Sequence, residues 1–141
     1  MAENKQHQFD FWLGTWEVTW GEHEHGTNRI ERILDGMIIQ ENFDGRPSLA
    51  MQGMSVSVFD SGRDKWCQTW VDSQGSYLDF TGEFRDDSMV LMRETMMDSK
   101  PIKQRMRWYN IATDELDWNW ERSEDNGQTW TLLWHIHYHR K

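Results

Sequence analysis

The sequence predicts an all-β protein, folded as an up-and-down antiparallel β-barrel of about 8–10 strands. Apolar and polar side chains alternate with a period of two along almost the whole chain, as in strands that bury one face. Turn signals such as Asp35-Gly36, Asp60-Ser61-Gly62 and Asn126-Gly127 recur at short intervals. The 10 Trp and 6 Phe supply the apolar surface of a folded core, which disordered chains lack.

Ten segments between these turn signals are expected to be strands: residues 12–20, 27–34, 37–43, 51–59, 65–71, 77–84, 89–95, 102–110, 115–123 and 129–140. In the first segment one face carries Trp12, Gly14, Trp16, Val18 and Trp20. The next six segments pair as hairpins around short polar turns, 27–34 with 37–43, 51–59 with 65–71, and 77–84 with 89–95. The last three each present one face of mostly large apolar side chains. At most a short helical turn is expected, near residues 5–11.

A single sheet of ten strands would curl or close, because strand twist accumulates and open edges invite aggregation. A closed barrel removes both problems. A two-sheet sandwich is the competing all-β fold, but its crossovers usually need longer connections than this chain offers. The turn lengths therefore favour a barrel, formed as a single domain over residues 1–141.

The net charge of −9 disfavours nucleic acid and anionic membrane surfaces as partners, because both repel an acidic protein. No apolar run approaches the ~20 residues that a membrane span needs, and residues 1–8 lack the apolar stretch of a secretion signal. Cys67 has no second cysteine with which to form an intramolecular disulfide. A reduced, cytoplasmic setting is therefore expected.

Residues 9–18 read Phe-Asp-Phe-Trp-Leu-Gly-Thr-Trp-Glu-Val. This run resembles the Gly-x-Trp opening strand of the calycin barrels, which include the lipocalins and the intracellular fatty-acid-binding proteins. It is more closely similar to a bacterial domain family of unknown function with a lipocalin-like fold, whose members open with Phe-Asp-Phe-Trp-Leu-Gly-x-Trp. Residues 29–36, 66–72 and 126–130 resemble later blocks of that family.

The resemblance implies a barrel with one closed end and an interior cavity, and it implies no reaction. In calycins the tryptophan of the opening motif closes the barrel floor and packs against a basic residue near the C-terminal strand. Trp16 would therefore pair with Arg140 or Arg122. The chain lacks the long C-terminal helix and the disulfides of true lipocalins, which argues against an extracellular carrier.

The apolar strand faces are expected to line a ligand cavity, with a solid packed core as the alternative. Tryptophans and methionines would form an adaptable wall. Gln68, Gln104 and Arg122 would be its polar anchors, and Arg122 would favour an anionic headgroup. The expected ligand-binding residues are Met54, Trp66, Gln68, Trp70, Gln104, Met106, Trp108, Trp118, Trp120 and Arg122.

The predicted function is the binding of a small hydrophobic or aromatic molecule, and the alternative is a cofactor-free isomerase, cyclase or hydratase that uses the same cavity. A carboxyl group pointing into the cavity would distinguish the enzyme, because burial raises the pKa of such a group and suits it to general acid work. The candidates are Asp72 and Asp79 near the barrel mouth, and Glu41 and Glu94 further back in the strands.

Three histidines, His135, His137 and His139, alternate on the last strand, opposite the face of Trp134 and Ile136, and are expected outside the barrel. We expect no metal and no other cofactor, although His135 and His137 are spaced to share an ion. Haem binding is a further alternative, since nitrobindin-type barrels place their proximal histidine at a position similar to His135 or His137. Parity opposes this alternative unless a β-bulge shifts the register.

Overall fold

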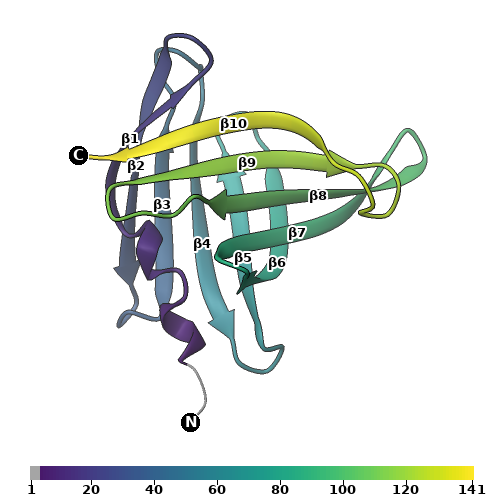
Figure 1. The fold of residues 1–141 in the computed structure, drawn as a ribbon, viewed down its shortest axis with the longest axis horizontal. Coiled ribbons are helices and arrows are strands. Elements are labelled where there is room, and N and C mark those ends of the chain that lie inside the picture. Colours follow the sequence, from purple (N-terminus) through teal and green to yellow (C-terminus); the bar gives the residue numbers. More distant parts are fainter. Residues whose placement is uncertain (1–3) are drawn as a thin grey trace.

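The computed structural model describes residues 4–141, which form a closed antiparallel barrel of ten strands in which each strand pairs with its neighbours in the chain and β1 pairs with β10 (Figure 1). The predicted up-and-down barrel is therefore confirmed, and residues 1–3 of the predicted domain lie outside the described part. The strands are β1 (Gly14–Trp20), β2 (Glu24–Ile33), β3 (Ile38–Asp44), β4 (Gln52–Asp60), β5 (Lys65–Asp72), β6 (Tyr77–Arg85), β7 (Ser88–Met97), β8 (Lys100–Tyr109), β9 (Glu115–Ser123) and β10 (Thr131–Arg140).

The observed strands overlap all ten predicted segments. Two of them begin two residues later than predicted, β1 at Gly14 because Trp12 belongs to a 3₁₀ turn, and β10 at Thr131. Other strands are longer than predicted because their turns are tighter than expected. The β7–β8 turn consists of Asp98 and Ser99, both with positive φ (52° and 64°), so β7 extends to Met97 and β8 begins at Lys100. Positive φ at both central residues is the geometry that matches the twist of a two-residue hairpin. β2 likewise begins at Glu24, opposite Trp20, rather than at residue 27.

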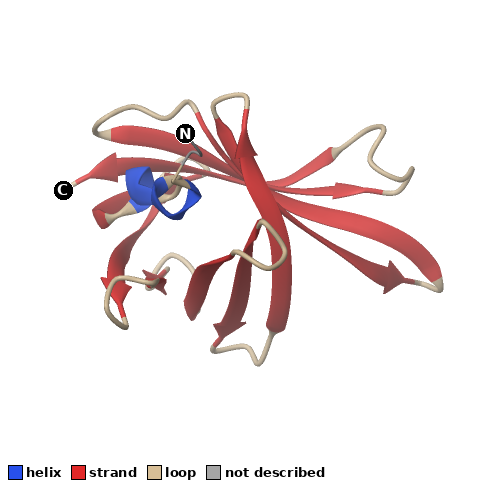
Figure 2. Cartoon of the chain, turned by 90° about the horizontal axis from the view of Figure 1, so that it is seen from below, coloured by secondary structure: helices blue, strands red, loops and turns tan. Residues whose placement is uncertain are grey.

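Two short 3₁₀ turns, η1 (Lys5–His7) and η2 (Asp10–Trp12), precede β1 and confirm the helical turn expected near residues 5–11. Seen along the barrel from below, they lie against one end (Figure 2). The side chain of Arg32, on β2, holds them there by donating to the Gln6 carbonyl oxygen and to the Asp10 carboxylate.

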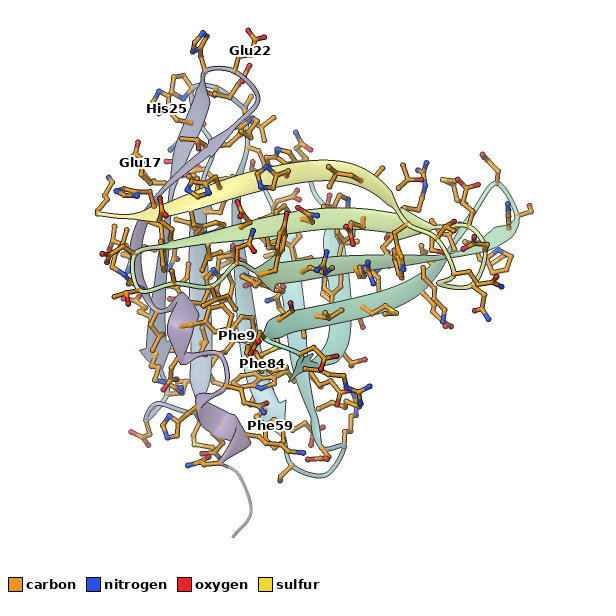
Figure 3. All side chains as sticks on the ribbon, in the orientation of Figure 1. Phe9, Glu17, Glu22, His25, Phe59 and Phe84 are labelled. Carbon is orange, nitrogen blue, oxygen red and sulfur yellow. The ribbon has the colours of Figure 1, made fainter. Side chains whose placement is uncertain are left out.

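The end of the barrel beneath these turns is closed by packed aromatic rings. Phe9 stacks on Trp12 with ring centroids 4.8 Å apart and meets the edges of Trp66 and Trp108 at 5.3 and 5.0 Å. Figure 3 shows Phe9, Phe59 and Phe84 gathered near this end, far from Glu22 in the β1–β2 turn and from His25 near the start of β2. We call this end the floor, defined by Phe9, Trp12, Trp16, Trp66 and Trp108.

Trp16 joins the floor to the C-terminal strand. Its indole nitrogen donates to the Trp12 carbonyl oxygen at 2.9 Å, and the guanidinium carbon of Arg140 lies 4.1 Å from the centre of its ring. Arg140 also donates to the carbonyl oxygen of Leu13 at 2.7 Å. Of the two arginines considered from the sequence, Arg140 is therefore the partner of Trp16, and Arg122 is not.

The described residues contain no helix long and apolar enough to cross a lipid bilayer.

Candidate functional site

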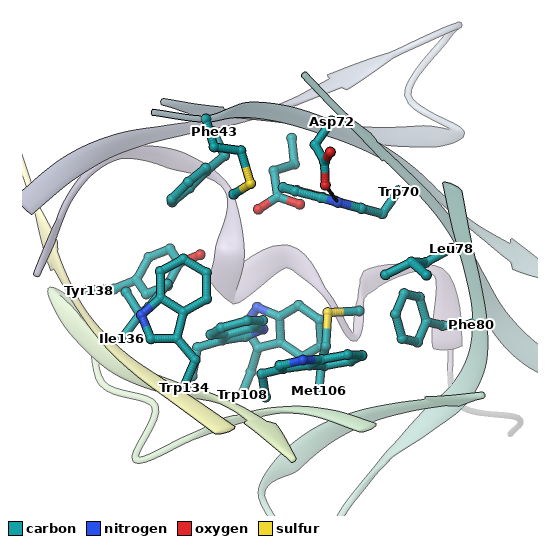
Figure 4. Close-up of a pocket in the computed structure, with 14 residues that line it drawn as sticks. Phe43, Trp70, Asp72, Leu78, Phe80, Met106, Trp108, Trp134, Ile136 and Tyr138 are labelled. Carbon is teal, nitrogen blue, oxygen red and sulfur yellow. Dashed lines mark hydrogen bonds between the residues drawn. The ribbon is translucent and has the colours of Figure 1, made fainter. Parts of the chain in front are cut away.

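Above the floor the barrel contains a cavity of about 190 Å³ that opens at the opposite end (Figure 4). The side chains around it are mostly aromatic. Its wall comprises Glu41, Phe43, Met51, Trp70, Asp72, Leu78, Phe80, Met106, Trp108, Trp118, Trp120, Trp134, Ile136 and Tyr138. The cavity, rather than a solid core, therefore occupies the upper part of the barrel.

On the β5 side of the cavity, the position of the Trp70 ring requires a glycine on the neighbouring strand. A Cβ atom at Gly53, on β4, would lie 2.2 Å from the Trp70 ring, so only glycine allows the indole to lie across that strand. The Trp70 indole nitrogen donates to Asp72 Oδ2 at 2.8 Å, the bond drawn in Figure 4. The contact with Gly53 and this hydrogen bond together fix the orientation of the Trp70 ring at the cavity mouth.

Other rings around the cavity pack edge to face. Trp134, on β10, meets Trp118 at 5.7 Å and Phe43 at 6.2 Å between ring centroids. Phe80 meets Trp120 in the same way at 5.8 Å. Edge-to-face pairs stabilise each other beyond their burial, so these rings keep their places around an unfilled space.

A buried polar group interrupts the apolar wall. Glu41, on β3, is 7% exposed, and its carboxylate accepts hydrogen bonds from Asn28 Nδ2 and from the Ser55 hydroxyl, each at 2.8 Å. Asn28 Nδ2 also donates to the Tyr138 hydroxyl oxygen at 2.8 Å. Burial raises the pKa of Glu41 above its ordinary range, and the two hydrogen bonds oppose that shift without cancelling it.

Asp72 is the second carboxyl group of the wall, and its pKa shifts the other way. Partial burial opposes ionisation, but hydrogen bonds from the Trp70 indole and from the backbone amides of Ser76 and Gln74 outweigh it and lower the pKa of Asp72. The cavity mouth therefore carries a carboxylate that is ionised at neutral pH. Asp79 and Glu94, the other two candidates, are exposed and line no part of the cavity.

Five residues of the predicted site lie together in the cavity wall: Trp70, Met106, Trp108, Trp118 and Trp120. Two others face the interior but lie deeper. Trp66 belongs to the floor, and Gln68 is 2% exposed and donates to the Ser57 hydroxyl at 2.9 Å. Neither of these two touches the cavity.

Gln104 and Arg122 are adjacent across β8 and β9, beyond the outer limit of the cavity wall. Gln104 accepts a hydrogen bond from Arg93 at 2.6 Å, and Arg122 Nε lies 3.6 Å from Glu124. Arg122 therefore does not line this cavity, although an anchoring role was expected for it. It is the last residue but one of β9, and Figure 1 shows the ends of β7 to β9 extending past the rest of the barrel.

Met54 is on the outer face of β4 and is 38% exposed, so its expected place in the cavity is also wrong. The cause is the parity of β4. Its inward positions are Ser55 and Ser57, two small polar residues, whereas Met54 and Val56 point to solvent. A rule that places apolar side chains inside fails on this strand because the interior here is polar.

His135 and His137 lie on the outer face, as their parity predicted. Both approach the same oxygen of Asp117 at 2.9 Å, and this carboxylate raises the pKa of His137. The bulge in β10 falls between Leu132 and Trp134, before the histidines, and leaves Trp134 and Ile136 inside. Neither histidine lines the cavity, and residues 4–141 contain no cluster of three metal-ligating side chains.

Glu41 is the functional candidate whose importance the sequence understated. The signal was present in the sequence, because Glu41 shares the parity of Ile39 and Phe43, the apolar residues on either side of it on the same strand face.

No protein-family model matches the chain, and no curated protein matches its sequence.

Proposed function

We propose that this barrel binds a small, largely apolar or aromatic molecule in the cavity. The observation that carries the proposal is the apolar cavity of about 190 Å³ above a close-packed floor. Engineered apolar cavities of about 150 Å³ remain dry and bind benzene, so the space suits a molecule built around one aromatic ring. The proposal includes a cytoplasmic setting and a calycin-like origin, which rest on the single cysteine and on the opening motif.

A series of single-ring aromatic probes tests this proposal. Binding should change tryptophan emission, raise the melting temperature and give a negative heat-capacity change, because each probe buries apolar surface against indole rings. If a broad panel of such probes changes none of these quantities, the cavity does not bind ligands and the proposal fails.

A variant that fills the cavity sharpens the test. Leu78, on β6, lines the mouth, and Leu78→Trp should abolish probe binding by occupying the space. Val71→Trp is the matched control, because Val71 lies on the neighbouring strand but is 38% exposed on the outer face. The control should bind the probes as the wild type does.

A second candidate function is acid–base catalysis in the same cavity, favoured by the presence of Glu41 in its wall. Burial raises the pKa of Glu41, and a raised pKa suits a carboxyl group to general acid work. Molecules extracted from protein purified from its own host would be incubated with the protein in deuterium oxide. Catalysed deuterium exchange that Glu41→Gln abolishes, while binding persists, would favour the enzyme over the binding protein.

A further inference from the structure

The ionisable side chains that residues 4–141 contribute to the cavity wall include two acids and no base. Glu41 lies deep in the wall and Asp72 at the mouth, and the cavity touches no Lys, Arg or His among the described residues. Arg93 and Arg122 face inward on β7 and β9 but lie outside the wall. A ligand in the cavity therefore meets the ionised Asp72 carboxylate at the mouth, the Glu41 carboxyl group deeper in the wall, and no positive charge from the described residues at contact distance.

Neither acid has a basic partner within the described protein. Glu41 is held by Asn28 and Ser55, and Asp72 is held by an indole and two backbone amides, all of which are neutral donors. Glu121, a buried acid on the outer face of β9, shows the contrast, because it pairs with Arg105 at 2.6 Å. The cavity acids have no such counter-ion, and a cation entering the cavity would supply it.

The remaining wall suits a cation as well. Figure 4 shows Asp72 and Trp70 on one side of the cavity, with Trp134 and Trp108 across from them. Indole faces attract organic cations through the negative charge of their π-systems, and the attraction strengthens where water is excluded. Aromatic rings combined with an unpaired carboxylate form the usual environment of an ammonium ligand.

We propose that the cavity selects an organic cation, specifically a single aromatic ring that carries an ammonium group. This inference rests on the proposed function, since it names the class of molecule that the cavity binds. The aromatic ring fills the space between Trp118, Trp134 and Phe80, and the ammonium group lies toward Glu41 and Asp72. An anionic ligand of the same size would bring its charge close to both carboxylates.

Three probes of matched shape test the charge preference: 2-phenylethylammonium, neutral propylbenzene and 3-phenylpropionate. At low ionic strength the cation should bind at least about tenfold more tightly than propylbenzene, and the anion more weakly than either. The preference for the cation should shrink as salt is added, because the mouth carboxylate is partly exposed.

Variants identify the groups responsible. Asp72→Asn should reduce the preference for the cation several-fold while leaving propylbenzene binding nearly unchanged, and Glu41→Gln should do the same. Asp79→Asn is the matched control, because this acid is exposed on the outer face of β6 and should leave the preference intact. Thermal melts of each variant show whether it is folded, and either folded variant suffices for the test.

The possible outcomes separate the inference from the proposed function. If propylbenzene binds as tightly as the cation, or if the anion binds best, the inference is overturned while the proposed function stands. If none of the three probes binds, both fall. A cation preference that survives in folded Asp72→Asn and folded Glu41→Gln also overturns the inference, because the carboxylates would not be its source.

Discussion

The floor and the cavity of this barrel are built from the same kind of residue and are packed differently. Trp12, Trp16, Trp66 and Trp108 are at most 1% exposed, whereas Trp70, Trp118 and Trp134 are only partly buried around an open space. The floor has a plug from its own chain, since η2 and the preceding Phe9 supply rings that fill it. Among residues 4–141, no segment fills the cavity end in this way. Both ends of the barrel are rich in tryptophan, so tryptophan content does not explain why only the floor is solid. The floor is solid because the N-terminal segment packs its own rings into it.

The largest expected effect is the loss of a floor ring. Trp16→Ala should lower the free energy of unfolding by about 3–5 kcal/mol, because it removes a fully buried ring that Arg140 and Tyr138 cannot close over. Urea unfolding monitored by far-UV circular dichroism measures the change. A loss below about 1 kcal/mol would mean that the floor is not close-packed.

Arg140→Met should have the next largest effect, about 2 kcal/mol. The guanidinium donates to the carbonyl oxygens of Leu13 and Thr113 and covers the Trp16 ring, and methionine keeps the packing while losing the donors. In Trp16→Ala the same substitution should cost less, since the stacking partner is gone. Strictly additive losses in this double-mutant cycle would refute the coupling of Arg140 to Trp16.

The floor could be predicted from the sequence and the polar wall could not, for a physical reason. Parity assigns Trp16 and Trp108 to the interior, because burying indoles is favourable in any barrel register. Trp12 was predicted as a strand residue but is buried from the 3₁₀ turn η2. Glu41 can be buried because Ser55 and Asn28, on the two neighbouring strands, donate hydrogen bonds to its carboxylate. Such cross-strand partners are known only after the register is known. Likewise, Arg122 shares the inward parity of Trp118 and Trp120, and its absence from the cavity wall depends on where along β9 the cavity ends.

Replacing a tryptophan of the cavity wall should destabilise the fold less than replacing a tryptophan of the floor. Trp118→Ala should lower the free energy of unfolding by about 1–2 kcal/mol, because the ring already borders an open space and its removal enlarges a cavity without creating one. The same urea measurement applies, with Trp16→Ala as the comparison. Equal losses for the two substitutions would mean that the cavity end is packed as tightly as the floor.

The smallest expected effect concerns the pH dependence of stability at the cavity end. Burial raises the pKa of Glu41 in the folded protein, so above its ordinary value near 4.5 the folded state binds more protons than the unfolded chain. Stability contributed by this group is therefore present at low pH and declines as the pH rises through the raised pKa. Glu41→Gln removes that decline, so the stability of the wild type minus that of the variant should fall as the pH rises above about 4.5.

Asp72→Asn should show the opposite pH dependence of stability, although Asp72 lines the same cavity. Hydrogen bonds lower the pKa of Asp72 in the folded state, so its contribution is present above the ordinary value near 3.8 and is lost as the pH falls through the lowered pKa. Urea midpoints measured in steps from pH 3 to pH 8 give both difference curves. The Tyr138 hydroxyl does not interfere, because burial raises its pKa beyond this range. A flat or rising curve for Glu41→Gln would mean that its carboxyl group is solvated in the folded protein, and the cavity would then lack the buried acid that distinguishes it from the floor.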